Sequence, residues 1–210
     1  MTQSAKFWDK IAERYAQSPV RFAESYQQTM ARTRSYLTAT DRVLEIGAGT
    51  GSTALELAPL VAHLTATDFA PQMVKIGAEK ARTQGVTNID FVVADALVPD
   101  LTGPFDVVLA HNVLHLVDDL PALLARLHDL LTPGGLLISK TLCRPQRRGP
   151  LIYYALRLLL PIAQALGKAP ALNFMSVKQL ETALTDQGFE IIESTTTPAK
   201  ELRRYIVARR

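Results

Sequence analysis

The sequence is poor in the residues that build disulfides and metal sites. Its 210 residues include one cysteine, Cys143, and four scattered histidines. A lone cysteine excludes an intramolecular disulfide and favours a reducing compartment. The cysteine and the histidines lack the close ligand spacings of a zinc site, so the sequence predicts no metal centre.

Long hydrophobic runs are also missing. Lysines and an arginine interrupt the first 15 residues, so we expect no secretory signal and a cytoplasmic location. The most apolar stretch, residues 151–160, contains Arg157 and is followed by Pro161. A membrane-spanning helix needs about 20 apolar residues, so this stretch is not expected to span a bilayer.

The composition fits one globular domain with an uneven charge. Apolar residues make up 48% and charged residues 20% of the chain, so residues 1–210 are expected to form a single domain. Residues 1–139 carry a net charge of −4 and residues 140–210 a net charge of +7. The basic part lacks the interleaved aromatic residues of nucleic-acid-binding surfaces. Acidic small molecules or anionic lipid headgroups are therefore the more favoured partners, and nucleic acid is disfavoured.

The chain alternates between short strand-like and longer helix-like segments. Strands are predicted near residues 42–46, 62–67, 89–94, 105–110, 135–141, 189–195 and 202–208, and helices near residues 5–16, 20–37, 51–58, 70–83, 118–131 and after Ser176. This alternation predicts an α/β fold with a mostly parallel sheet, in which the last two strands pair antiparallel. Residues 132–135, Thr-Pro-Gly-Gly, are expected to turn from a helix into the fifth strand.

The segment 43–51 organises the predicted fold. An apolar run that includes Glu45 leads into three glycines at alternate positions, Gly47, Gly49 and Gly51. Glycine has no Cβ, so it can take a positive φ and let a ligand lie against bare backbone. The helix predicted next would aim its unpaired N–H groups at the same loop. The segment is therefore predicted to be a binding loop.

Polar residues end the following predicted strands. Asp68 closes the second strand 17 residues after Gly51, near the spacing of roughly 20 residues at which an acid binds a ribose. Asp95 closes the third strand, and His111 and Asn112 close the fourth. Ligands of parallel α/β sheets bind at the carboxyl ends of the strands, so these side chains are predicted to share one site.

These motifs resemble the class I S-adenosylmethionine-dependent methyltransferases, especially their small-molecule branch. The resemblance runs from about residue 7 to the C-terminus and is most specific over residues 43–140. It implies a Rossmann-like three-layer sandwich with a seven-stranded, mostly parallel sheet whose last strand is antiparallel. It also implies S-adenosyl-L-methionine as methyl donor, S-adenosyl-L-homocysteine as product, and a small-molecule acceptor. The apolar stretch at residues 151–160 favours a lipophilic or aromatic acceptor. The Asn-Pro-Pro-aromatic signature of base-methylating relatives is replaced by His-Asn-Val-Leu at residues 111–114.

The resemblance also implies which residues hold the cofactor. The glycine loop takes the methionine end, Asp68 the ribose hydroxyls and the pair Asp95 and Ala96 the adenine, while Tyr15 closes the pocket. The predicted cofactor-binding residues are Tyr15, Glu45, Gly47, Ala48, Gly49, Gly51, Asp68, Phe69, Met73, Asp95, Ala96 and His111.

Two segments are expected to flank the site. By the same resemblance, residues 1–38 form a helical cap over the cofactor and residues 144–175 form a helical insertion over the acceptor side. The apolar stretch within that insertion is expected to act as a lid. Core packing, a dimer contact and docking on a membrane surface stay open as alternatives, and so does the oligomeric state.

The predicted reaction is direct in-line transfer of the sulfonium methyl group to an O, N or C nucleophile, which requires mainly positioning. Where the acceptor must lose a proton, His111 and His115 are the predicted bases, because an unperturbed imidazole titrates near pKa 6.5. One alternative is a nicotinamide-dinucleotide oxidoreductase, although the third glycine comes one residue early for that fingerprint. A non-catalytic S-adenosylmethionine-binding partner protein is the other.

Overall fold

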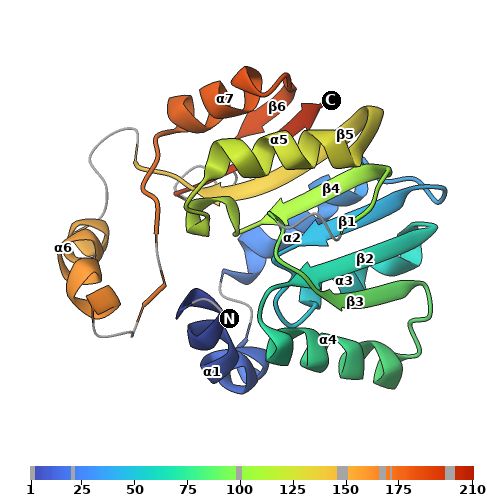
Figure 1. The fold of residues 1–210 in the computed structure, drawn as a ribbon, viewed down its shortest axis with the longest axis horizontal. Helices are drawn as coiled ribbons and strands as arrows, with labels where there is room; N and C mark the ends of the chain where they lie inside the picture. The colour runs from blue at the N-terminus through green and yellow to red at the C-terminus, as the bar shows by residue number, and fades with distance from the viewer. Residues whose placement is uncertain are drawn as a thin grey trace.

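The computed structural model describes residues 3–19, 22–97, 101–145, 151–165, 169–170, 172–196 and 202–210. The elements are α1 (Gln3–Gln17), α2 (Ala23–Arg34), β1 (Arg42–Ile46), α3 (Ser52–Leu57), η1 (Ala58–Leu60), β2 (His63–Asp68), α4 (Pro71–Gln84), β3 (Ile89–Val93), β4 (Phe105–His111), η2 (Leu114–Leu116), α5 (Leu120–Leu130), β5 (Leu131–Leu142), α6 (Leu151–Ala165), α7 (Val177–Asp186), β6 (Glu190–Thr195) and β7 (Arg203–Arg209). Figure 1 shows their arrangement. Residues 197–201, between β6 and β7, lie outside the described residues.

The seven strands form one sheet in the order β3-β2-β1-β4-β5-β7-β6. β7 runs antiparallel to both β5 and β6, and the other neighbouring strands pair in parallel. The prediction of a seven-stranded α/β sheet with a reversed last strand is confirmed. The strand order reverses between β1 and β4, and a crevice at such a switch point is where open α/β sheets bind ligands.

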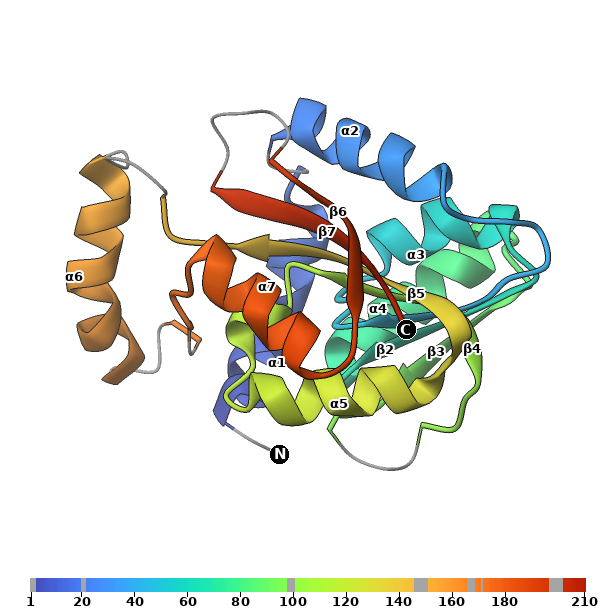
Figure 2. The same cartoon turned by 90° about the horizontal axis from the view of Figure 1, so that it is seen from above.

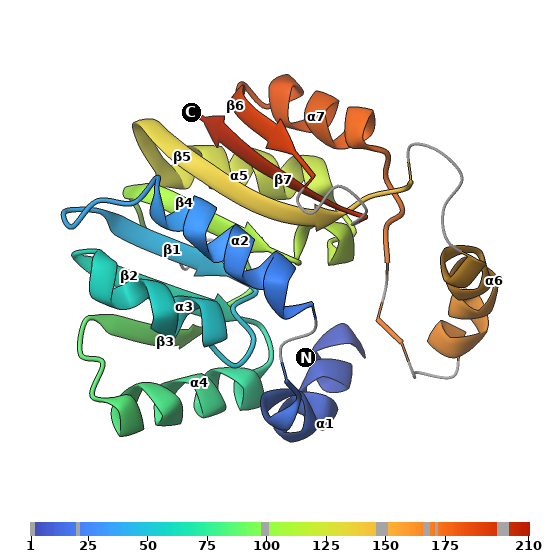
Figure 3. The ribbon, with the colours of Figure 1, turned by 180° about the vertical axis from the view of Figure 1, so that it is seen from behind.

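Helices cover both faces of the sheet, because alternate residues of the central strands are apolar on both sides. Leu44 and Val108 face α5 and α7 within one buried cluster. Val43 and Leu109 face α2 and α3 within another. Figures 2 and 3 show these layers, with α5 and α7 on one side and α2, α3 and α4 on the other. The three-layer arrangement is the one that the sequence predicted.

The last helix of the sandwich begins where the sequence signals it. The side chain of Ser176 accepts from the backbone N–H of Gln179 at 3.1 Å, and Gln179 Oε1 accepts from the backbone N–H of Ser176 at 2.8 Å. This capping box satisfies two N–H groups that a helix start otherwise leaves unpaired. It fixes the first residue of α7 and so the packing of Leu180 on the sheet.

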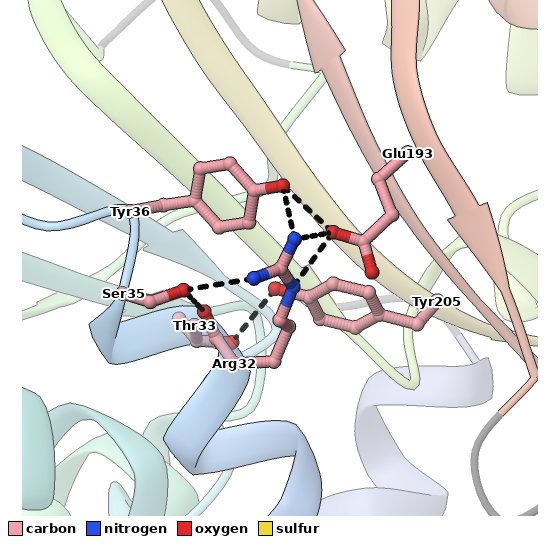
Figure 4. Close-up of polar contacts among 6 residues, drawn as sticks. All are labelled: Arg32, Thr33, Ser35, Tyr36, Glu193 and Tyr205. Carbon is pink, nitrogen blue, oxygen red and sulfur yellow. Dashed lines mark hydrogen bonds and ion pairs between the residues drawn. The ribbon is translucent and has the colours of Figure 1, made fainter.

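A cluster of polar side chains ties α2 to the C-terminal strands (Figure 4). Glu193 of β6 accepts from Arg32 Nε and from the hydroxyl of Tyr36, each at 2.7 Å. Thr33 Oγ1 lies 3.3 Å from the hydroxyl of Tyr205 on β7. These bonds join residues more than 150 positions apart and hold α2 across the sheet.

The start of β5 differs from the prediction. Thr132–Gly135 was expected to form a turn, but β5 begins at Leu131, directly after α5. Leu131 pairs with Phe105, and the register then shifts so that Leu136 pairs with Val107. Gly134, with a φ of +80°, lies in this bulge. Gly134 therefore belongs to a β-bulge inside β5, and not to a turn that precedes the strand.

Two helices lie outside the sandwich. α1 packs on the first turn of α4, where Ala12 meets Ala70 and Met73. α6 stands apart from the sheet layers in both Figure 1 and Figure 2. Its buried side contacts the segment after it, because the rings of Tyr153 and Phe174 meet edge to face with centroids 5.8 Å apart.

Candidate cofactor and acceptor site

The ends of four neighbouring parallel strands meet at one edge of the sheet. Gly47 follows β1, Asp68 ends β2, Asp95 follows β3 and His111 ends β4. The backbone links adjacent ends, because Ala48 N donates to Thr67 O at 2.9 Å and Ala94 N donates to Asp68 O at 3.1 Å. The structure thus brings together the strand ends that the sequence singled out.

The surroundings of the three loop glycines differ. All three have positive φ, between +56° and +77°. A Cβ on Gly47 would lie 2.7 Å from Val113, and one on Gly51 would lie 2.5 Å from Phe91, so tight packing explains these two positions. A Cβ on Gly49 would meet only Tyr15, at an ordinary 3.8 Å. Gly49 is therefore the position where bare backbone is open to a ligand.

Asp68 fixes the shape of the glycine loop through hydrogen bonds to the backbone. Its Oδ2 accepts from the backbone N–H of Gly49 and its Oδ1 from that of Ala70, each at 2.9 Å. Burial raises the pKa of this carboxyl, whereas the N–H donors of Ala70 and Gly49 lower it. Each oxygen keeps a second lone pair, so a ribose hydroxyl can still donate to the same carboxylate.

Glu45 lies beneath the loop and is 3% exposed. Its Oε2 is buried without a hydrogen-bond partner among the described residues. Burial, and then the charge of Asp68, raise the pKa of Glu45 to about 8. The carboxyl therefore holds a proton at neutral pH, and a cationic group placed beside it would stabilise its ionised form.

We expect the contribution of Glu45 to the stability of the protein to fall as the pH rises from about 4.5 to 8. The folded state keeps the Glu45 proton up to a pKa of about 8, whereas the unfolded state loses it near 4.5. Between these values the folded state binds the extra proton, so the Glu45 contribution to the free energy of unfolding decreases by at most ~1.4 kcal/mol per pH unit. Thermal melting of the wild type and of Glu45→Gln at several pH values tests this. The variant should gain in relative melting temperature toward pH 8, and parallel pH profiles would contradict the assignment.

Aromatic and apolar side chains border the loop on the side of α1. Tyr15 is half exposed above Gly49, and its ring meets that of Trp8 edge to face with centroids 6.2 Å apart. Desolvation and then the charges of Asp68 and Glu45 raise the pKa of Tyr15. Beside it, Met73 is buried in the first turn of α4. Phe69, between Asp68 and α4, is half-buried.

The predicted adenine pair lies at the next strand end. Asp95 is exposed and its Oδ1 accepts from the backbone N–H of Leu97 at 3.0 Å, while Ala96 packs against the core. Residues 98–100, which follow, lie outside the described part of the chain. The pair is thus placed at the same edge as Asp68, with its carboxylate open to solvent.

His111 lies beside a buried lysine. Lys140 is its register partner on β5 and donates through Nζ to Ser25 Oγ at 2.6 Å and to Thr29 Oγ1 at 2.8 Å. Burial and the charge of Lys140 lower the pKa of His111 to about 4. Its Nε2 is buried and has no hydrogen-bond partner within the described ranges. The ring is therefore neutral through the physiological range.

His115, which lies in a different element from His111, is also buried near a cationic side chain. It lies in η2, where burial and then the charge of Arg203 lower its pKa to about 4. Its backbone carbonyl accepts from Asn173 N at 2.7 Å, and Arg203 Nε donates to Asn112 Oδ1 at 2.8 Å. The premise that these imidazoles titrate near pKa 6.5 is therefore wrong, because the sequence does not show the burial and the neighbouring cations.

A cavity of about 420 Å³ lies between the insertion and the first residues of α5 and α7. It is lined by Leu120, Arg144, Arg157, Asn173, Phe174, Met175 and Gln179. Two guanidinium groups and two amides make this lining polar at several points, and three apolar side chains complete it. A ligand with both an apolar part and an anionic or hydroxyl part fits such a lining.

Several residues near the strand ends were not found from the sequence. Lys140 stands between Ser139 and Thr141 in β5, and its place inside a strand was the signal for a buried cation. Arg203 and Asn173 come from β7 and from the segment before α7, and nothing local marks them. Within the described ranges, no group of three or more His, Cys, Asp or Glu side chains could hold a metal ion.

Comparison with known proteins decides the family. Residues 8–194 match the family described as a methyltransferase domain. The chain belongs to this methyltransferase family. Its membership confirms the predicted class I S-adenosylmethionine-dependent fold and cofactor, and leaves the nicotinamide alternative without support.

Curated relatives of the methyltransferase extend the comparison. It is 34% identical over 151 residues to a ubiquinone biosynthesis O-methyltransferase of Caulobacter sp. (strain K31). That match covers 67% of this chain and 60% of the relative, so the chain spans less than two thirds of the relative's length.

Solved structures share the fold at lower identity. The DhpI complex with S-adenosylhomocysteine is 21% identical, with a TM-score of 0.75 over 99% of this chain and 95% of that one. The [4+2]-cyclase SpnF is 19% identical, with a TM-score of 0.73 over 92% and 83%. The fold of this chain is thus shared with a protein that is named as a cyclase.

Proposed function

We propose that the protein transfers the methyl group of S-adenosylmethionine to a hydroxyl oxygen of a small lipophilic acceptor. The open backbone of Gly49, between Asp68 and Tyr15, is the observation that carries the proposal. A ligand can lie against bare backbone there, with a carboxylate on one side and an aromatic ring on the other. The oxygen acceptor follows from the names of the curated relatives.

The residues present fit this cofactor. The unpartnered Oε2 of Glu45, as far as the chain is described, suits a cationic group such as an ammonium. Asp68 suits a pair of ribose hydroxyls, and Asp95 with Ala96 suits an adenine. Phe69 and Met73 supply apolar surface beside them. Gly47, Ala48 and Gly51 shape the loop itself. When bound, the cofactor would supply a sulfonium methyl group, and its transfer to the acceptor hydroxyl would yield a methyl ether, S-adenosylhomocysteine and a proton released to solvent.

The chain contributes positioning to that reaction. His111 and His115, held neutral, can each accept a hydrogen bond from an acceptor hydroxyl and orient it. Their low pKa makes them weaker proton acceptors than free imidazole, so the main effect we assign to the protein is alignment of acceptor and donor. Arg203 and Asn112 fix the position of η2 and hence of His115.

We place the acceptor beside the insertion, under residues 144–175, and we place the helical cap of residues 1–38 over the cofactor. The cavity beside Phe174 supports the first assignment and the position of Tyr15 supports the second. The lipophilic character of the acceptor rests on the apolar insertion. A cytoplasmic location stays a prediction from the sequence.

Two measurements test the proposed function. Calorimetry should show binding of both S-adenosylmethionine and S-adenosylhomocysteine. Incubation with the cofactor and hydroxylated aromatic compounds bearing hydrophobic tails should then yield S-adenosylhomocysteine and one methylated acceptor in equal amounts by mass spectrometry. Binding with no product for any hydroxyl, amine or carbon acceptor would favour a protein that uses this fold for another purpose. The similarity to a cyclase makes that second candidate specific.

The two adjacent tyrosines of α6 separate the lid hypothesis from general packing. Tyr153 is 5% exposed and faces Phe174, whereas Tyr154 is 48% exposed. Tyr153→Ala should lower turnover of a soluble acceptor by about 10-fold or more, because an aromatic wall contributes roughly 1.5 to 3 kcal/mol of apolar contact. Tyr154→Ala is the matched control and should leave turnover unchanged. Equal effects of the two variants, or a loss of cofactor binding, would contradict the lid hypothesis.

A further inference from the structure

The outward side of α6 carries large apolar side chains that are exposed to solvent. Tyr154, Leu158, Leu159 and Ile162 are 48%, 76%, 58% and 60% exposed. Positions 154, 158 and 162 are four residues apart and so lie on one face of the helix. Tyr153 and Leu160 lie on the opposite face and are buried. The helix is therefore anchored on one side and exposes large hydrophobic side chains on the other.

The charged residues on either side of α6 in the sequence have one sign. Residues 130–180 contain seven lysines and arginines and no aspartate or glutamate. Of these, Arg144 and Arg157 are exposed, whereas Lys140 is buried. A partner that covers the apolar face also meets these positive charges. An anionic surface complements them.

The dimensions suit a helix that lies along an interface. α6 has 15 residues, which corresponds to about 22 Å at 1.5 Å per residue. Among the described residues, no helix is long and apolar enough to cross a membrane. A short amphipathic helix with basic residues near its apolar face binds in the headgroup region of a bilayer. α6 stands apart from the sandwich (Figures 1 and 2), and the apolar side chains of its outward face are exposed.

We propose that the outward face of α6, formed by Tyr154, Leu158, Leu159 and Ile162, docks on an anionic lipid bilayer. The opposite side of the helix contacts Phe174 through Tyr153, and the exposed Arg157, between the two sides, also lines the cavity. Docking would thus bring the insertion, and the cavity beneath it, to the membrane surface where a lipophilic acceptor is concentrated. The purpose of docking rests on the proposed function, but docking itself does not.

Vesicle sedimentation without cofactor or acceptor tests the proposal independently of activity. The wild type should sediment with vesicles of phosphatidylcholine and phosphatidylglycerol, bind vesicles of phosphatidylcholine alone at least about 10-fold less, and be released by high salt. The double variant Leu158→Gln/Ile162→Gln should lose at least about 10-fold in binding, since it removes two apolar contacts. The matched control Leu60→Gln/Ile192→Gln alters two exposed apolar residues elsewhere and should bind like the wild type.

A charge pair refines the test. Arg157→Gln should weaken binding to anionic vesicles, whereas Arg82→Gln, on α4, should not. Circular dichroism and S-adenosylhomocysteine binding check that each variant is folded. Absence of vesicle binding by the wild type, or equal binding to both lipid mixtures, would overturn the proposal. It would also be overturned if light scattering showed a dimer that Leu158→Gln/Ile162→Gln dissociates without any effect on lipid binding.

Discussion

Gly49→Val is expected to abolish measurable cofactor binding while the protein remains folded. A side chain at Gly49 would point into the open space beside Tyr15, where we place the bound ligand. The backbone φ of +56° adds strain of roughly 1 to 2 kcal/mol for any residue with a Cβ. We expect the affinity for both S-adenosylmethionine and S-adenosylhomocysteine to fall by at least about 100-fold, which corresponds to ~2.7 kcal/mol.

Gly85 provides the control for the strain alone. It ends α4 with a φ of +69°, and a Cβ there would meet nothing within 4 Å. Gly85→Val should therefore lower the melting temperature much as Gly49→Val does and leave calorimetric affinity unchanged. If both variants bind the cofactor normally, the loop serves packing and the proposed site must lie elsewhere.

Asp68→Asn is expected to weaken both cofactor forms by about 10- to 150-fold, or roughly 1.5 to 3 kcal/mol, the range for hydrogen bonds to a charged group. Asparagine keeps the size of the side chain but offers a single acceptor oxygen. The wild-type carboxylate accepts from Gly49 and Ala70 with its two oxygens, so the variant also loosens one side of the loop. Equal losses for S-adenosylmethionine and S-adenosylhomocysteine are expected, because the two share the ribose.

Asp90→Asn is the matched control, since Asp90 is an exposed residue of β3 that pairs with His63. It should leave affinity unchanged. Calorimetry of a folded Asp68→Asn protein with wild-type affinity would remove Asp68 from the proposed site.

The cofactor half of the site was accessible from the sequence because its signals are local. An apolar strand that ends in a glycine loop or an acid places its last residue at the sheet edge, so Gly49 and Asp68 could be aligned without knowledge of distant contacts. The sequence did not reveal which glycine faces open space. That distinction depends on Val113, which follows β4 and packs against Gly47, and on Phe91 of β3, which packs against Gly51.

The acceptor side of the site was harder to predict from the sequence, because residues that are distant in the chain determine its properties. His111 looked like a base until Lys140, on the adjoining strand, and its burial were known. Arg203 acts on His115 from 88 positions away along the chain. The apolar run of α6 left several alternatives open, since periodicity does not say which side of an apolar helix is covered. The structure separates Tyr153 from Tyr154 on that point.

The position of β7 has a consequence for the order in which the molecule assembles. β7, the last strand in sequence, lies between β5 and β6, so β6 has no neighbour in the sheet until β7 is present. α2 depends on the same late elements, because Arg32 and Tyr36 bond to Glu193 and Thr33 meets Tyr205. During synthesis α2 is therefore made long before Glu193 and Tyr205, and contacts over such sequence separations form slowly. β6 joins the sheet only once β7 has been made, so the bonds that hold α2 across the sheet form after both strands are in place.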